Sequence, residues 1–148
     1  LGQCLGAEVI RSTAEGAPDI VWIFHRRCYT FEAKAGNQLS KKYVLQAKGH
    51  VEWVRAKYPE LSDIPVQPLM VSTGNEIDQL VRPFVNGLNF ISMSDIAEFG
   101  QTVATSLQTL RTQFTGKEYG IVLEHLKTEI RLMKLDDESV EKLLSIPL

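Results

Sequence analysis

The residues best suited to chemistry lie in the segment GAPDIVWIFHRRCYTFEAKAG, residues 16–36. Asp19 stands at the start of one apolar run, and Glu32 stands inside the next run, two residues before Lys34. Successive side chains of a strand point to opposite faces of a sheet, so Glu32 and Lys34 share a face. If the two runs pair as an antiparallel hairpin through the turn HRR, Asp19 comes nearly opposite Ala33. The sequence therefore predicts two carboxylates and one ammonium group near a common point.

Two converging carboxylates repel each other unless a cation lies between them. Hard oxygen ligands with open coordination positions suit Mg²⁺, which keeps several waters and accepts phosphate oxygens as further ligands. Such a metal polarises a phosphodiester and lowers the pKa of a bound water. Lys34 would orient the attacking water or help to deprotonate it, and would stabilise charge that develops on the phosphate. The pattern favours hydrolysis of a phosphodiester.

A purely structural interpretation of the same residues is also open. Asp19 would then cap a turn, and Glu32 and Lys34 would form a solvated pair on an edge strand. The run IVWIF after Asp19 argues against it, because such an apolar run suits a central strand with little room for charge.

Three short strands and one helix are expected to position these groups. Residues 7–13, 19–25 and 28–35 predict a meander of strands. Residues 40–58 predict a helix with Ser40 as its N-cap. We expect one apolar stripe on this helix, formed by Val44, Ala47, Val51, Val54 and Tyr58. The opposite side is expected to carry Lys42, Gln46, His50, Trp53 and Lys57.

The remainder of the chain predicts two more strands followed by helices. The strands are expected at residues 66–73 and 88–93, with a short helix or loop between them. Helices are expected from Ser94 to about Phe114, then at about residues 118–135 and 138–146. The fold class is therefore α/β, with extra C-terminal helices.

The short motifs on the first two predicted hairpin strands resemble those of a known superfamily. The letters PD at residues 18–19 and EAK at residues 32–34, followed by a helix, are similar to the PD-(D/E)XK nucleases with their restriction-endonuclease-like fold. The resemblance implies a mixed β-sheet core flanked by helices. It covers about residues 1–95, which would form the nuclease core, and leaves residues 96–148 as a helical extension of the same domain.

The resemblance also implies a set of site residues. Asp19 and Glu32 would ligate Mg²⁺ together with the backbone carbonyl of Ala33, and Mn²⁺ is expected to substitute. Lys34 would be the catalytic lysine. Gln46 matches the place where several branches of the family have an auxiliary glutamine.

One departure from the family pattern concerns a third acidic ligand. Many members carry a glutamate on a helix before the first strand, and here only LGQCLG precedes that strand. Glu8 lies in the first predicted strand and is a poor substitute. Either the ligand lies upstream of this sequence or this branch lacks it. Because the sequence begins with leucine, we expect a domain of a longer protein, with upstream domains as partners.

Four further residues are candidates for DNA contacts. Arg26 and Arg27 would hold a phosphate backbone, or would merely make a hairpin tip soluble. Lys42 would attract any DNA sequence. His50 would contact a phosphate or the leaving group, or would be a neutral residue on an exposed helix face.

Composition limits the class of protein. The 148 residues carry a net charge of −2 and are 44% hydrophobic, which suits one globular domain. Residues 1–58 hold nine Lys and Arg against five Asp and Glu, so a basic half surrounds the acidic motif. Cys4 and Cys28 form neither a disulfide framework nor a zinc motif, and no membrane span or signal peptide is visible, so a cytoplasmic setting is expected.

The sequence as a whole predicts a Mg²⁺-dependent deoxyribonuclease, a hydrolase of the endonuclease kind, in a larger restriction, repair or defence protein. A homodimer is expected, because cutting both strands of a duplex calls for two sites. One alternative is a nuclease fold with weak or no turnover that serves DNA binding or assembly. The other is an interaction domain whose motif is a coincidence.

Overall fold

The strands expected to carry the site are neighbours in one sheet of the computed structural model, which describes residues 1–148 except 37, 74–75, 78, 117–118, 134 and 145–148. The five strands of this sheet, in spatial order, are β1 (Glu8–Arg11), β2 (Ile20–Ile23), β3 (Cys28–Lys34), β5 (Val66–Ser72) and β7 (Asn89–Ser92). Two short strands, β4 (Gln38–Leu39) and β6 (Glu76–Ile77), form a separate parallel pair. The helices are α1 (Lys41–Lys57), α2 (Met93–Phe114), α3 (Tyr119–Leu132) and α4 (Asp137–Leu144).

Strand direction changes at β3, the strand that carries Glu32. The strands β1, β2 and β3 form the expected antiparallel meander, whereas β3, β5 and β7 are parallel. Parallel neighbours need a crossover connection, and α1 supplies it between β3 and β5. The α/β class with a mixed sheet and flanking helices is thus confirmed. The restriction-endonuclease-like assignment stays a prediction.

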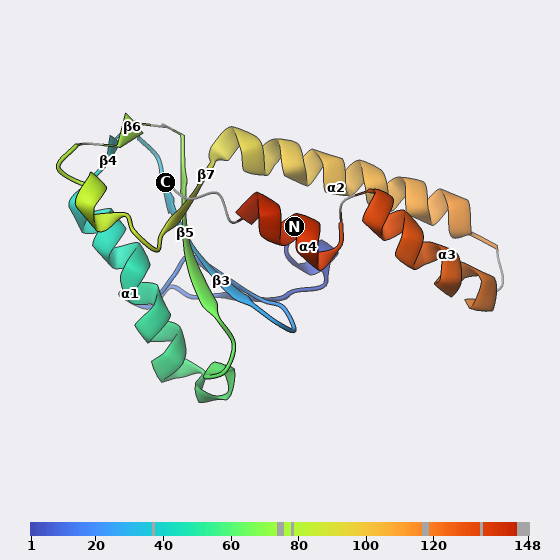
Figure 1. The fold of residues 1–148 in the computed structure, drawn as a ribbon, viewed down its shortest axis with the longest axis horizontal. Helices are drawn as coiled ribbons and strands as arrows, with labels where there is room; N and C mark the ends of the chain where they lie inside the picture. The colour runs from blue at the N-terminus through green and yellow to red at the C-terminus, as the bar shows by residue number, and fades with distance from the viewer. Residues whose placement is uncertain (37, 74–75, 78, 117–118, 134, 145–148) are drawn as a thin grey trace.

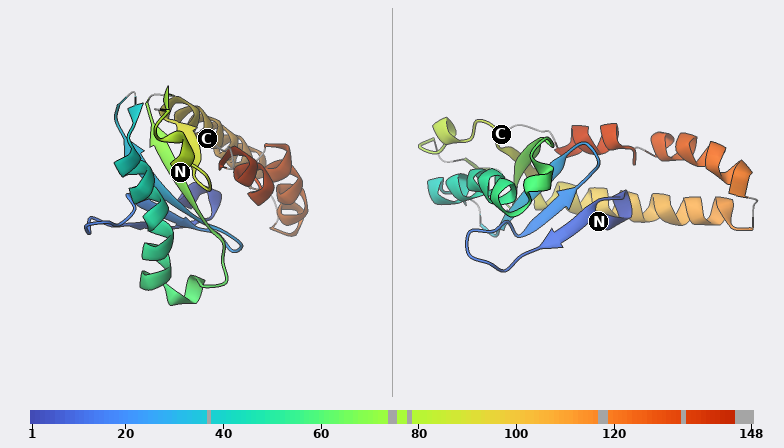
Figure 2. Two further views of the ribbon diagram at one scale, coloured as in Figure 1. Left: turned by 60° about the vertical axis from the view of Figure 1, so that its left-hand side comes forward. Right: turned by 90° about the horizontal axis from the view of Figure 1, so that it is seen from below.

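The two faces of β3 are covered by different helices. Tyr29 and Phe31 belong to a buried cluster that also contains Val140 of α4. Thr30 and Glu32, which alternate with them, are buried on the side of α1. Figures 1 and 2 show α1 on one side of the sheet, with α2 and α4 on the other. The strand therefore presents its polar residues to α1 and its aromatic residues to the C-terminal helices.

The helix α1 follows Ser40, the expected N-cap position, but its buried face differs from our expectation. The buried residues are Val44, Ala47, His50 and Val54. We placed His50 on the exposed side with Gln46, and this is wrong, because the side chain is 0% exposed. His50 follows Ala47 by three residues and precedes Val54 by four, so all three lie on one side of the helix. The exposed-face contact with DNA expected of His50 fails for the same reason.

The C-terminal helices extend the sheet domain to one side. The α2 helix begins at Met93, one residue before the expected Ser94, and the Oγ atom of Ser92 accepts a hydrogen bond from the backbone N–H of Asp95 at 3.0 Å. The α3 helix lies beside α2 (Figures 1 and 2), and its Leu126 packs against a buried cluster that contains Leu110 of α2. Among the described residues, no helix has the length and apolar character needed to cross a membrane.

Candidate active site

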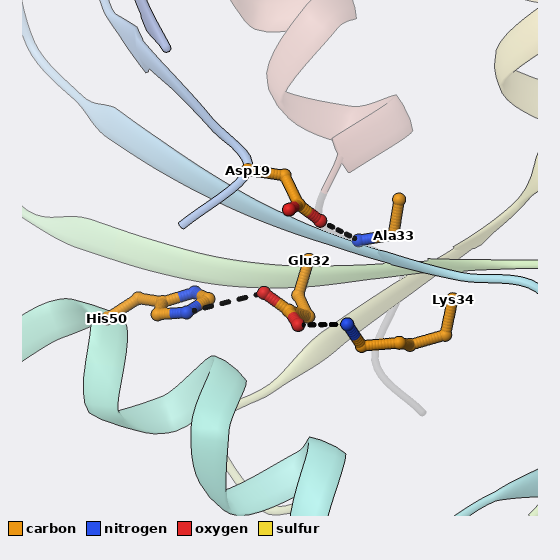
Figure 3. Close-up of polar contacts among 5 residues, drawn as sticks. All are labelled: Asp19, Glu32, Ala33, Lys34 and His50. Carbon is orange, nitrogen blue, oxygen red and sulfur yellow. Dashed lines mark hydrogen bonds and ion pairs between the residues drawn. The ribbon is translucent and has the colours of Figure 1, made fainter. Parts of the chain in front are cut away.

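The position of Asp19 is set by the register of the β2–β3 hairpin. Ile20 pairs with Phe31 at the end of the hairpin farthest from its turn, so Asp19, one residue further, falls opposite Glu32. The Asp19 N–H donates to the Phe31 carbonyl at 3.0 Å, and the Asp19 Oδ2 atom accepts a hydrogen bond from the Ala33 N–H at 2.8 Å (Figure 3). The predicted convergence of Asp19 on Ala33 is therefore confirmed.

The Glu32 carboxylate lies between a lysine and a histidine. Its Oε1 atom is 2.6 Å from the Lys34 Nζ atom, and its Oε2 atom is 3.4 Å from the His50 Nε2 atom (Figure 3). The Glu32 side chain is 1% exposed, whereas that of Lys34 is 27% exposed. Within the described part of the chain, neither carboxylate oxygen has a partner with good hydrogen-bond angles, so the lysine contact is an ion pair by distance.

Burial and charge shift the pKa values of all three groups. Burial raises the pKa of Glu32, the contact with Lys34 opposes this, and the charge of Asp19 adds to the increase. The contact with Glu32 raises the pKa of Lys34, so its ammonium stays protonated. Burial lowers the pKa of His50 from 6.5 to about 4, which leaves a neutral imidazole at pH 7. Asp19 acts electrostatically on each of the three groups, so the four residues form one coupled cluster.

The Asp19 and Glu32 carboxylates offer hard oxygen atoms, the type of ligand that divalent cations such as Mg²⁺ prefer. The Glu32 oxygens are buried with no well-directed hydrogen-bond donor in the described part of the chain, and Asp19 is exposed. Among the described residues, no group of three or more His, Cys, Asp and Glu side chains is placed to hold a metal ion. Further ligands would have to be neutral oxygens, for which the Ala33 carbonyl is our candidate, together with water or substrate. Mg²⁺ commonly binds in this way, through one or two carboxylates while keeping several waters.

Two residues of α1 lie near the cluster in different ways. The Lys34 Nζ atom is 5.0 Å from the centre of the Tyr43 ring, a cation–π contact that our sequence analysis did not find. Gln46 precedes His50 by one turn and is half-buried, and its side chain makes no hydrogen bond to another described residue. Gln46 thus remains a candidate by position alone.

The basic candidates for DNA contacts are spread over the molecule. Arg26 and Arg27 lie in the turn before β3, at the opposite end of that strand from Lys34. The Arg27 guanidinium forms an ion pair with Glu141 of α4. Lys42 is exposed in the first turn of α1. The structure brings neither arginine to the carboxylate cluster.

Glu8 does not supply a third acidic ligand. It pairs with Ile23 at the far end of the β1–β2 ladder, whereas Arg11 pairs with Ile20 at the end next to Asp19. The structure instead places the polar side chain of His50 next to Glu32, in addition to that of Lys34. A stricter use of helical spacing would have found it, because His50 continues the stripe of Ala47 and Val54.

Neither a known protein-family model nor a curated protein matches the sequence. The resemblance to PD-(D/E)XK nucleases therefore depends on Asp19, Glu32 and Lys34 and on the hairpin that joins them.

Proposed function

We propose that this chain is a metal-dependent nuclease of the PD-(D/E)XK type that hydrolyses phosphodiester bonds of DNA. The observation that carries the proposal is the contact of the Asp19 carboxylate with the Ala33 N–H, directly between Glu32 and Lys34. It brings the two halves of the motif together although they are separated by 14 positions. A hairpin of this register brings these positions together, and the support for the proposal comes from the residue types that occupy them, two carboxylates and an ammonium group.

The carboxylates of Asp19 and Glu32, with the Ala33 carbonyl, would hold Mg²⁺ or Mn²⁺. When bound, the metal supplies Lewis acidity toward the phosphate and a more acidic water. Burial supports this role for Glu32, because a carboxylate removed from water and without directed donors gains most from a cation.

Lys34 has a narrower role than the sequence alone suggested. Without a bound metal, the contact with Glu32 raises the pKa of Lys34, so its ammonium is protonated and is suited to donate hydrogen bonds and to attract negative charge. We therefore assign it to orienting the phosphate and stabilising the charge that develops there, and not to accepting a proton from water. Its partial exposure leaves the ammonium accessible to a substrate from solvent.

One observation favours the second candidate, a nuclease fold that binds DNA or assembles without turnover. The Glu32 carboxylate is 1% exposed and is already neutralised in part by Lys34, as in an ordinary buried ion pair. A metal would then have to displace part of that contact.

A cleavage assay separates these functions. The chain is incubated with supercoiled plasmid and with a labelled duplex, in MgCl₂, MnCl₂ or EDTA. We expect nicking or cutting that EDTA abolishes and that Asp19→Asn and Glu32→Gln reduce by about 10²-fold or more. Glu52→Gln, which alters an exposed carboxylate on α1, is the matched control and should cleave normally.

Cleavage that survives in Glu32→Gln or in EDTA would contradict the proposal. Metal-dependent DNA binding without any cleavage would favour the second candidate. Absence of metal binding in the wild type would argue against both.

A further inference from the structure

The side chain of His50 is fully buried although it is polar. Its side chain is 0% exposed, between α1 and β3, and its Nε2 atom faces the Oε2 atom of Glu32 at 3.4 Å. Neither ring nitrogen has a well-directed hydrogen-bond partner in the described part of the chain. Burying an unpaired polar group is unfavourable, whereas a leucine would fill a similar space without that cost.

The partner fixes which ring nitrogen carries the proton. A carboxylate only accepts hydrogen bonds, so an unprotonated Nε2 would direct its lone pair against the Glu32 oxygen. A neutral imidazole with its proton on Nε2 donates to that oxygen and leaves Nδ1 as an acceptor.

We propose that His50 is a positioning residue, whose Nε2–H donates to Glu32 Oε2 and fixes the carboxylate opposite Lys34. The hydrogen bond is inferred from the 3.4 Å approach of the two atoms and from the burial of both side chains, while its consequence for metal binding rests on the proposed nuclease function. His50 and Lys34 approach different oxygens of Glu32, so they restrain the carboxylate from two sides. Each oxygen keeps a second lone pair for another partner.

A histidine suits this place better than a second cation would. A neutral N–H donor orients the carboxylate without cancelling the negative charge that a divalent ion needs. A lysine or arginine at position 50 would neutralise Glu32 and compete with the metal. Hydrogen bonds of this kind to ligating carboxylates typically contribute about 10–100-fold to metal affinity or activity.

The first test measures the tautomer of His50 in the metal-free wild type by ¹⁵N NMR of the imidazole nitrogens. Signals of His50 are assigned by their loss in His50→Gln, which separates them from those of His25 and His125. We expect a neutral ring protonated on Nε2, with a signal that shifts in Glu32→Gln and does not shift in Glu52→Gln. A ring protonated on Nδ1, or a His50 signal with the same chemical shift in wild type and Glu32→Gln, overturns the proposal.

The second test compares three substitutions of His50. The amide nitrogen of Gln lies near the place of Nε2, whereas Asn is shorter and Leu offers no donor. We expect His50→Gln to keep Mn²⁺ affinity within a few-fold in calorimetric titration. His50→Asn and His50→Leu should lose about 10–100-fold. Thermal unfolding of each variant shows whether it is folded.

The outcomes separate this inference from the proposed function. Wild-type Mn²⁺ affinity in a folded His50→Leu would overturn the positioning role and leave the nuclease proposal intact. If the wild type neither binds Mn²⁺ nor cleaves DNA, the nuclease proposal fails, and the tautomer still decides whether His50 positions Glu32.

Discussion

The backbone N–H of Ala33 donates a hydrogen bond to the side chain of Asp19. Ala33 lies on β3 between Glu32 and Lys34. This single hydrogen bond at 2.8 Å holds an exposed carboxylate against the strand that carries the buried one. Because both residues lie on or directly beside paired strands, their separation is set by the β2–β3 register and not by loop geometry.

Asp19→Asn should remove the negative charge at this position while keeping the hydrogen bond to the Ala33 N–H. The asparagine oxygen can still accept from the Ala33 N–H, so we expect a change in the free energy of unfolding below about 0.5 kcal/mol. Asp19→Ala removes the acceptor and should lose about 1 kcal/mol. Both variants should lose Mn²⁺ affinity by at least about 10-fold. Urea unfolding and calorimetric titration measure the two effects, and unchanged Mn²⁺ affinity in Asp19→Asn would exclude this residue as a ligand.

Removing Lys34 should expose the cost of a buried, unpaired Glu32. In EDTA at pH 7, we expect Lys34→Ala to lower the free energy of unfolding by about 1–2 kcal/mol, which is less than for a fully buried pair because Lys34 is 27% exposed. The double variant Glu32→Gln, Lys34→Ala should recover most of this loss. Urea unfolding of the wild type, of the two single variants and of the double variant gives the coupling energy between Glu32 and Lys34.

The exposed pair Glu138 and Lys142 of α4 is the control for that cycle. Its nitrogen and oxygen are 3.0 Å apart and its side chains are 79% and 75% exposed, so Lys142→Ala should change stability by less than about 0.5 kcal/mol. Similar losses at both lysines would mean that Glu32 is in effect solvated.

The hairpin and its carboxylates were predictable because short-range rules determine them. Alternation along β3 places Glu32 and Lys34 on one face, and antiparallel pairing brings Asp19 to Ala33; both are local consequences of strand geometry. The strand order was not predictable in this way, because the parallel pairing of β3 with β5 depends on where α1 packs.

The surroundings of Glu32 were the part that sequence reasoning missed. We expected His50 on the exposed side because it continues the row of Lys42 and Gln46 at a spacing of four residues. In the structure it instead belongs to the buried side with Ala47 and Val54. A buried histidine becomes favourable only when its partner, Glu32, is known to lie across from it. Likewise, the contact of Lys34 with Tyr43 depends on the packing of α1 against the sheet.

Stability should depend on pH through His50. Burial lowers its pKa to about 4, so the unfolded chain binds more protons than the folded chain between about pH 6.5 and pH 4. Stability is therefore lost as the pH falls through this window, by about 3 kcal/mol in total. His50→Gln should not show this loss. Urea unfolding in EDTA across the window measures the difference between the two proteins, and parallel curves would show that His50 is already hydrated in the native state.

The raised pKa of Glu32 acts in the opposite direction. The folded chain holds this proton to higher pH than the unfolded chain does, so its contribution falls as the pH rises above the ordinary glutamate value of 4.5. Glu32→Gln in EDTA should therefore gain stability relative to the wild type as the pH rises, and a saturating divalent ion should reduce that advantage. A fixed difference at all pH values would mean that burial does not perturb Glu32.

Lys42 should attract DNA of any sequence if the first turn of α1 faces the substrate. Its side chain is exposed, and its neighbour Lys41 stacks on the Phe84 ring with its Nζ atom 4.0 Å from the ring centre, so two cations lie together at this end of α1. Loss of one lysine–phosphate contact reduces the steepness of log affinity against log salt concentration by about one. We expect this change in Lys42→Ala and no change in Lys57→Ala, an exposed lysine at the other end of the same helix. Affinity for a short duplex, measured in EDTA over a salt series, gives both slopes. Equal slopes in Lys42→Ala and wild type would show that DNA does not approach this end of α1, and a change in Lys57→Ala alone would place the DNA path at its opposite end.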